Sequence, residues 1–197
     1  MKFSCDKHLI QSAAATAARA ASAKSPIPAL EGLLIQAGAG VRLTGYDLKK
    51  GIYTTIEAEV ERPGSAVLNA RLFTEMLRRL PDGIVTVEVD GKNAVKVKCG
   101  RSAYDFIAID AAEYPELPEM DEAEAVSLPQ KTLKAMIDET IFAVSTNESR
   151  PVYMGSMFEI GGGQLTVVSV DGYRLALRRE KLEGSGRDGL SFIIPGA

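Results

Sequence analysis

The side chains of this chain with the greatest chemical reactivity are a histidine and two cysteines. Cys5 and His8 have the spacing of half a zinc site, but the chain has one histidine and Cys99 falls in a different predicted element. A zinc site needs four protein ligands, or three and a water. A single histidine also leaves a serine or cysteine nucleophile without its usual general base. We therefore interpret Cys5 and His8 as structural, and we expect no metal and no cofactor.

Two aspartates are the next candidates for chemistry. Asp47 ends the strand-like run RLTGYD, and Asp171 ends TVVSVD before Gly172. Such a pair could serve a small α+β enzyme, but aspartate in this position commonly organises a turn. Because the two occupy equivalent places in an internal repeat, we expect a domain's width between them. We favour two turns, and we interpret the glycines at 161–163 as a hairpin tip because no phosphate-loop pattern follows them.

The composition is that of an ordinary soluble protein. The chain has 197 residues, of which 46% are hydrophobic and 25% charged, with a net charge of −3. No run approaches the roughly 18 apolar residues of a membrane helix, and the N-terminus lacks a signal-peptide core. Two distant cysteines fit a reducing compartment. We expect a cytoplasmic protein with no membrane partner, and the acidic balance leaves room for local basic patches.

An internal repeat organises the chain. Equivalent segments share a proline, three residues, a glycine and then an apolar run, and the repeat drifts as one-residue loop changes would cause. The second copy would stop near the equivalent of residue 71, so we expect a fragment of a longer protein. The matches are Pro28 and Gly32 in 25–36 with Pro151 and Gly155 in 149–160 at an offset of 123, Leu9 with Leu133 and Asp47 with Asp171 at 124, and 64–70 with 190–196 at 126.

Periodicity predicts an α+β fold in which each repeat packs two helices on antiparallel sheet. The segment 111–125 is rich in proline and glutamate and predicts an interdomain linker. We expect a complete domain one at 1–120, a linker at 121–126 and part of domain two at 127–197. Helices are predicted over 7–22, 71–80 and 130–142, and strands at 2–5, 30–36, 41–46, 51–60, 65–69, 84–89 and 94–99, with a hairpin turn at Asp90-Gly91 and a closing strand at 102–110.

Basic side chains gather on helix faces opposite the apolar stripes. Arg71, Arg78 and Arg79 share the polar face of helix 71–80, while Lys131 and Lys134 begin helix 130–142. Solvated helix faces carry such charges routinely. Alone, they therefore do not establish a nucleic-acid site, which would need a geometry that brings the faces together.

The pattern of one known family runs in register through MKFSCDKHLI, SPIPALEGLLI, LTGYDL, RLFTEMLRRLPDG, AAEYPELP and NESRPVYMGSMFEI…VDGYRLAL. On these segments the chain resembles the bacterial DNA polymerase III sliding clamp, the beta subunit. That family has three similar domains per chain, and two chains close head to tail around duplex DNA. The resemblance implies the DNA clamp fold, with domain three absent. It also implies a non-catalytic processivity factor.

The resemblance assigns a DNA-lining role to helix faces and to one loop. A positive lining attracts phosphates without reading bases, so the contact with double-stranded DNA is independent of sequence and sensitive to salt. The implied residues are Lys24, Arg71, Arg78, Asn147, Ser149 and Arg150, with Arg79 and Lys134 as secondary candidates.

The resemblance also implies partners that bind through short apolar peptides: the polymerase III catalytic subunit, the clamp loader, and other polymerases and repair proteins. The peptides dock between domains two and three, where Gly172 permits close backbone approach. The family most often has threonine in place of Val170 and frequently histidine in place of Tyr173. These departures affect the expected fine selectivity for peptides and not the site itself. The domain-two residues implied are Tyr153, Val170, Gly172, Tyr173, Arg174, Leu175 and Leu177.

A third implied surface joins two full-length chains as a homodimer. The alternative for Leu72 and Met76 is that they fill the domain core. Since their partner surface lies in domain three, we do not expect this chain to close a ring. A clamp-like scaffold outside replication is the rival function. The implied interface residues are Leu72, Met76, Arg101, Tyr104 and Phe106.

Overall fold

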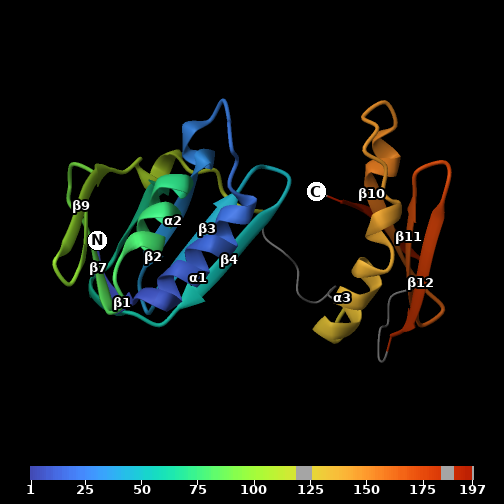
Figure 1. Ribbon diagram of the computed structural model, residues 1–197, viewed down its shortest axis with the longest axis horizontal. Helices are drawn as coiled ribbons and strands as arrows, with labels where there is room; N and C mark the ends of the chain where they lie inside the picture. Colours follow the sequence, from blue (N-terminus) through green and yellow to red (C-terminus); the bar gives the residue numbers. More distant parts are fainter. Residues whose placement is uncertain (119–125, 183–188, 197) are drawn as a thin grey trace. The chain divides into compact units, whose positions relative to one another are not determined.

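The computed structural model describes residues 1–118, 126–182 and 189–196. The chain divides into two compact units, Met1–Glu119 (unit 1) and Met120–Ala197 (unit 2), which are described separately (Figure 1). The predicted linker at 121–126 lies outside the described residues except for Val126. Across the described ranges, the helices are all too short or too polar to span a bilayer.

Unit 1 contains two antiparallel sheets. The five-stranded sheet has the order β5-β1-β7-β8-β9, and the four-stranded sheet has the order β4-β3-β2-β6. Together with the helices they confirm the α+β class. The strands are β1 (Lys2–Asp6), β2 (Gly32–Ala37), β3 (Val41–Tyr46), β4 (Gly51–Ile56), β5 (Glu59–Arg62), β6 (Gly64–Asn69), β7 (Ile84–Val89), β8 (Ala94–Cys99) and β9 (Ser102–Ile107).

Two helices lie side by side in unit 1 (Figure 1). The helix α1 (Lys7–Ala17) begins after Asp6, whose carboxylate accepts the amide of His8 at 2.8 Å. The helix α2 (Ala70–Arg79) begins after Asn69 in the same way. Side-chain oxygens at these positions satisfy amides that lack a partner in the first turn. The predicted helix 7–22 is therefore too long: α1 gives way to a 3-10 turn at Ala18–Ala20, and Ala21 is extended.

One hydrophobic core joins both sheets and both helices of unit 1. Phe3 of β1, Leu33 of β2, Ile10 of α1 and Phe73 of α2 are all completely buried in it. Alternate strand residues face this core, as a half-buried strand requires. The core fixes the helices against the sheets, so their outer faces carry the polar residues.

The segment predicted as one strand over 51–60 is two strands. The strand β4 pairs with β3, whereas β5 pairs with β1 in the other sheet. The chain changes sheet at Glu57 and Ala58, which belong to neither strand. The predicted hairpin turn is confirmed between β7 and β8, where the Asp90 carboxylate accepts two backbone amides.

The residues predicted to begin the linker belong to unit 1. A 3-10 turn spans Ala111–Glu113, and Tyr114 after it is 6% exposed within an apolar cluster. The linker prediction for 111–125 is wrong for residues 111–118. The proline and glutamate content of the segment is typical of a linker, but two of its apolar side chains, Tyr114 and Leu117, pack in the apolar cluster.

Unit 2 has one sheet, one helix and the strand order β12-β11-β10-β13 in its described part. The helix α3 (Gln130–Asp138) is shorter than the predicted 130–142, and a 3-10 turn at Ile141–Ala143 follows it. The hairpin tip predicted at 161–163 is confirmed, with positive φ at Gly162 and Gly163. The strands are β10 (Gly155–Gly161), β11 (Gln164–Val170), β12 (Leu175–Lys181) and β13 (Leu190–Pro195).

The repeat holds in three dimensions. The sheet β12-β11-β10-β13 has the same order and pairing as β4-β3-β2-β6. The helices begin at Lys7 and Gln130, an offset of 123, so Leu133 corresponds to buried Ile10 and not to Leu9. The predicted match of Leu9 with Leu133 is therefore wrong by one residue.

Candidate functional site

Asp47 organises a turn at the end of β3. Its Oδ1 atom accepts the amides of Lys49 at 3.0 Å and Lys50 at 2.8 Å. Leu48, between Asp47 and Lys49, has a φ of 71°. Burial would raise the pKa of Asp47, but these two hydrogen bonds and the charges of Lys49 and Lys50 together outweigh it, and the pKa lies below its usual value. Both lysine amides are thus held by a carboxylate that stays ionised.

Asp171 forms the same turn at the end of β11. Its Oδ1 atom accepts the amides of Tyr173 at 2.9 Å and Arg174 at 3.1 Å. Gly172, between Asp171 and Tyr173, has a φ of 96°. The hydrogen bonds from Tyr173 and Arg174 lower the pKa of Asp171. The two aspartates therefore serve equivalent turns in separate units, as the sequence predicted.

Cys5 and His8 do not share a site. The Cys5 side chain points into the core, and its burial raises the pKa of the thiol to about 12. His8 is exposed, and its Nε2 atom lies 3.2 Å from Oδ1 of Asp82. Within residues 1–118, 126–182 and 189–196, no three histidine, cysteine or carboxylate side chains gather in a way that could hold a metal ion.

The sheet of unit 2 has an apolar surface on the side opposite α3, which we call the outer face. Because side chains alternate along a strand, residues two apart share this face. Leu175 and Leu177 of β12 are 63% and 45% exposed. The outer face consists of Val152 and Tyr153, which precede β10, and the sheet residues Met157, Val168, Val170, Leu175, Leu177 and Ile193.

The predicted peptide-binding residues gather at one end of this outer face. Val170 and Leu175 are cross-strand partners, and the turn between them carries Tyr173, whose side chain is fully exposed. Arg174 is fixed beside them, because its Nε atom donates to Oδ2 of Asp171 at 2.8 Å. The structure thus places Val170 and residues 172–175 together around one turn.

Two cations and an unanticipated aromatic ring border this end of unit 2. The guanidinium of Arg174 lies 5.7 Å from the ring centre of Phe142, and that of Arg150 lies 5.9 Å from the ring centre of Tyr153. Such stacking holds a cation over an apolar ring. Phe142 is 58% exposed. The sequence pattern does not indicate it, because position 142 falls at the end of the predicted helix 130–142.

Two further outer-face residues escaped the sequence analysis. Val152 is 64% exposed and directly precedes Tyr153, and Ile193 is 45% exposed on β13. The repeat could have identified both, because their counterparts at the same offsets are Ala29 and Val67, which are buried together in unit 1.

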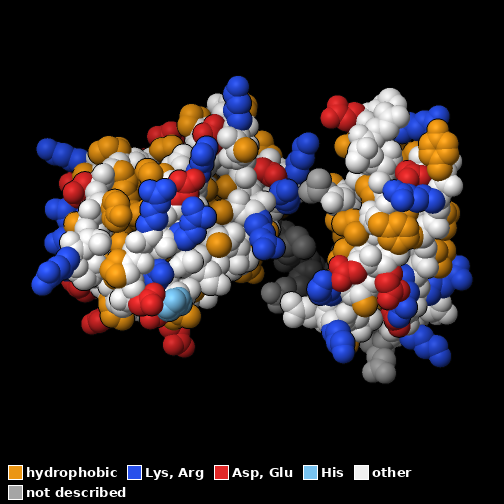
Figure 2. Space-filling view, viewed as in Figure 1, with side chains coloured by type: hydrophobic (Ala, Val, Ile, Leu, Met, Phe, Trp, Pro, Cys, Tyr) orange, Lys and Arg blue, Asp and Glu red, His pale blue; other side chains and the backbone are white. Residues whose placement is uncertain are grey.

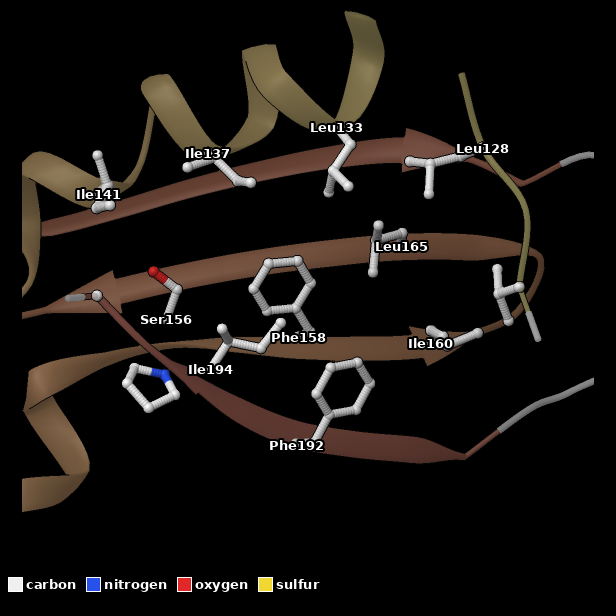
Figure 3. Close-up of a pocket in the computed structure, with 13 residues that line it drawn as sticks. Leu128, Leu133, Ile137, Ile141, Ser156, Phe158, Ile160, Leu165, Phe192 and Ile194 are labelled. Carbon is white, nitrogen blue, oxygen red and sulfur yellow. The ribbon is translucent and has the colours of Figure 1, made fainter. Parts of the chain in front are cut away.

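The opposite side of the same sheet, the inner face, holds a cavity of about 310 Å³ (Figure 3). Leu133 and Ile137 of α3 point into it from above, and Phe158 and Ile194 from the sheet. Its lining is almost wholly apolar and includes none of the predicted peptide-binding residues. The residues on this face correspond to the core of unit 1, so the cavity is a core surface and not a site with chemistry.

The predicted DNA-lining residues of unit 1 lie on its surface, and Figure 2 views the side on which α1 and α2 lie. Arg71 forms an ion pair with Glu75 at 3.3 Å. Arg78, Arg79 and Lys24 are exposed and have no ion pair within the described part of the chain. The last turn of α2 therefore carries two positive charges that are not locally neutralised.

The predicted DNA-lining loop of unit 2 is built from tight turns. The Asn147 side chain accepts the amide of Ser149 at 3.0 Å, and its carbonyl accepts the amide of Arg150 at 3.2 Å. All three residues are exposed. Lys134, by contrast, is paired with Asp138 at 2.6 Å on the same helix. The loop offers an uncompensated arginine, and Lys134 offers little net charge.

The predicted interface residues lie on α2, on the edge strand β9 and in the turn before it. Leu72 and Tyr104 are 49% and 40% exposed, and Phe106 is partly buried against the core. Arg101 is exposed in the turn before β9. Met76 is 6% exposed and belongs to the core of unit 1. The interface prediction is corrected for Met76, whose side chain fills the core as the alternative stated.

Comparison with known proteins matches the whole chain. The family model for the "DNA polymerase III beta subunit, N-terminal domain" matches residues 1–118, and that for the "central domain" matches residues 127–197. The beta sliding clamp of Bacillus subtilis is 35% identical over 205 residues, and that of Halalkalibacterium halodurans is 37% identical over 208. These alignments cover 100% of this chain and 54% of each relative, so the chain spans about half their length.

Solved structures give the same result. The crystal structure of the DNA polymerase sliding clamp from Bacillus subtilis superimposes with a TM-score of 0.95 at 34% identity. The beta subunit from DNA polymerase of Streptococcus pyogenes superimposes with a TM-score of 0.91 at 30% identity. In both cases 100% of this chain is covered, against 54% of the other chain.

Proposed function

This chain belongs to the DNA polymerase III beta subunit family, the beta sliding clamps, and we propose that it forms part of a replication processivity factor. In this role it contributes surfaces for DNA and for partner proteins and performs no catalysis. The single observation that carries the proposal is the match of both units, in order, to the two domain models. The proposal places the protein in the cytoplasm, with no cofactor.

The outer face of unit 2 is proposed as part of the peptide-binding site. Its support is a set of exposed apolar side chains, among them Leu175 and Leu177, next to the fixed turn at Gly172. Apolar anchors of a short peptide would lose water against these side chains, and the backbone near Gly172 is open to approach. The proposed partners are the polymerase III catalytic subunit, the clamp loader and other polymerases and repair proteins.

Fluorescence anisotropy with a labelled short peptide that carries two apolar anchors tests this assignment. The double variant Leu175→Ser with Leu177→Ser should weaken binding at least about tenfold, as loss of two apolar contacts implies. Leu9→Ser is the matched control, because Leu9 is 47% exposed in unit 1. Equal binding by all three proteins would remove the outer face from the site.

The basic helix and loop residues are proposed as sequence-independent DNA contacts. Their support is that the described residues offer no ion-pair partner to Arg78, Arg79, Lys24 or Arg150. In the full-length protein, binding to duplex DNA should weaken with salt, and each lost phosphate contact should reduce the log–log slope by roughly 0.9. Arg78→Ala with Arg79→Ala should therefore reduce the slope by almost 2, whereas Arg62→Ala, which removes an arginine paired with Glu88, should leave it unchanged.

Encirclement of DNA by a homodimer is the proposed mechanism of the whole protein. The exposed Leu72 of α2 and Tyr104 of the edge strand β9 support an interface on unit 1. Full-length protein loaded on nicked circular DNA should stay bound in high salt and leave when the circle is linearised. Equal retention on linear DNA would contradict encirclement and favour a clamp-like scaffold outside replication.

A further inference from the structure

The last described residues of unit 1 form a strap over the outer side of its four-stranded sheet. We call residues 109–118 the strap. Its first residue, Ile109, exchanges two backbone hydrogen bonds with Val67 of β6, at 3.0 and 2.9 Å. Further along, the Tyr114 hydroxyl donates to the carbonyl oxygen of Thr44 at 3.3 Å. The strap is therefore bound to two strands of the sheet, by backbone at one end and by a buried side chain near the other.

The surface beneath the strap is an apolar cluster separate from the main core. Leu30, Tyr46 and Val67 are each at most 8% exposed there, together with Tyr114 of the strap. The burial of Tyr114 raises the pKa of its hydroxyl to about 12. Its ring thus occupies a site from which water is excluded, as a bound aromatic anchor would.

A second strap residue fills a space made by a glycine. Leu117 lies against Gly51 at the start of β4, and a Cβ atom on Gly51 would lie 2.7 Å from Cδ2 of Leu117. Between the two anchors, Pro115 is half-buried and Glu116 is exposed. The strap therefore contacts the sheet as a short extended peptide does, through two apolar anchors separated by two residues that face away or lie at the margin.

The surface beneath the strap is the repeat counterpart of the outer face of unit 2. Both lie on the side of the repeated sheet away from the helices, and their residues match at the offsets that the strand pairing fixes. The counterparts are Leu30 and Tyr153 (123), Tyr46 and Val170 (124), Gly51 and Leu175 (124), and Val67 and Ile193 (126).

We propose that unit 1 contains a second peptide groove, and that the strap fills it as an intramolecular ligand. The groove accepts an extended peptide with an aromatic anchor and, three residues later, an aliphatic one. A tethered ligand has an effective concentration in the millimolar range, so it excludes free peptides of similar affinity. Pro115 limits the conformations of the strap before it docks, which lowers the entropy lost on binding. The inference concerns unit 1 alone and does not depend on peptide binding by unit 2.

The two grooves differ at one position that decides their ligands. Gly51 leaves room for Leu117, whereas its counterpart Leu175 carries a side chain at the equivalent position, 63% exposed. An aliphatic anchor placed like Leu117 therefore fits the groove of unit 1 and is displaced in unit 2. The chain thus carries one groove closed by its own sequence and one that is open among the described residues.

Complementation of an emptied groove tests the proposal. In the chain with Tyr114→Ala and Leu117→Ala, a synthetic peptide of residues 113–118 should bind at least about tenfold more tightly than to the unchanged chain. Isotope-edited NMR should place the shift changes at Val67 and Tyr46. The same peptide with alanine at both anchor positions should not bind.

A milder variant keeps the test decisive if the double variant does not fold. Leu117→Ala retains Tyr114 and empties only the space beside Gly51, so its affinity for the peptide should fall between those of the unchanged chain and the double variant. Folding of each variant is checked by the resistance of buried Cys5 to alkylation. Absence of binding by every folded variant, equal binding to the unchanged chain, or shift changes at Val170 and Ile193 instead would each overturn the proposal.

Discussion

Each unit contains its own copy of the same four-stranded sheet, but the two units bury this sheet to different extents. In unit 1, Ala66 and Leu68 of β6 are 1% and 0% exposed under α2 and the second sheet. Their counterparts on β13, Phe192 and Ile194, are 40% and 45% exposed. The strand order of this sheet and the turns at Asp47 and Asp171 are the same in both units. Burial depends on what covers the sheet.

The helices differ for the same reason. Ala13, Ala14 and Ala17 of α1 are small, so α1 lies close to the sheet and to α2. The counterparts in unit 2 include Met136, which is completely buried, and Ile137, which lines the cavity of the inner face. Small residues permit close approach of backbones, and larger ones fill the space that remains. The same arrangement of helix and sheet can therefore be packed with small side chains, as in unit 1, or with larger ones, as in unit 2.

The largest expected effect comes from emptying the closed core. Phe73→Ala should lower the free energy of unfolding of unit 1 by about 3–5 kcal/mol, because Phe73 is completely buried. Phe192→Ala should lower that of unit 2 by about 1 kcal/mol, since Phe192 keeps much of its contact with water and loses its stacking on Phe158. Urea unfolding measures both, and alkylation of Cys5 and Cys99 reports unit 1 alone. Equal losses would show that the inner face of unit 2 is as closed as the core of unit 1.

The closest contact between helix and sheet gives the next effect. A Cβ atom on Gly45 would lie 2.0 Å from the carbonyl oxygen of Ala17, so Gly45→Ala should cost about 3 kcal/mol. Its counterpart Ser169 forms a buried hydrogen bond with Ser156 at 2.7 Å. Ser169→Ala should cost about 1 kcal/mol, the usual net value of such a bond. The same urea titrations compare the two, and a larger loss for Ser169→Ala would reverse the proposed difference in packing.

The shared turn allows an exchange test with smaller effects. Leu48 has a φ of 71° and Gly172 a φ of 96°, a region that costs an ordinary side chain about 1 kcal/mol. Leu48→Gly should therefore raise the free energy of unfolding of unit 1 by less than about 1 kcal/mol, while Gly172→Leu should lower that of unit 2. Thermal unfolding detects both shifts, and a loss from Leu48→Gly would mean that its side chain, 55% exposed, contributes more than the strain it causes.

The smallest effect is the pH dependence of the turn in unit 2. The backbone hydrogen bonds to Asp171 lower its pKa in the folded chain. The stabilisation from Asp171 is therefore present above its unfolded pKa, near 4, and is lost as the pH falls through the lower folded value. NMR titration of the carboxyl carbon should show a pKa below that of a model peptide, and Asp171→Asn should remove this step from the acid unfolding of unit 2. An unshifted titration would contradict the hydrogen-bonded turn.

The sequence predicted the elements whose signals are local. The amphipathic pattern of 71–80 gives α2 within one residue, and Asp90-Gly91 marks the hairpin because its side chain and backbone specify a turn. The repeat was found in the sequence and holds in the strand pairing. These features need only the spacing of nearby residues.

The features that escaped prediction depend on contacts between distant residues. The helix α1 ends at Ala17 although alanine continues to favour helix, since the close approach at Gly45 fixes its position on the sheet. Tyr114 is buried although its neighbours are those of a linker. Met76 is an apolar residue of a kind found both in interfaces and in cores, and only the packing of α2 shows that its side chain belongs to the core. Around the proposed peptide site, the sequence predicted the turn at Asp171, and it did not predict the exposed ring of Phe142 beside Arg174.

The hairpin tip at Gly161–Gly163 is also a place to modify the protein. In unit 1, Ala37 pairs with Val41 at the equivalent tip. Their counterparts Ile160 and Leu165 also pair, but the segment between them is one residue longer. The fold has therefore already accepted a change of length here, and a Cβ atom would meet nothing within 4 Å at each of the three glycines. A fluorophore, an affinity tag or a short epitope inserted at this tip should leave the sheet intact, and it would report on binding to the outer face without altering it.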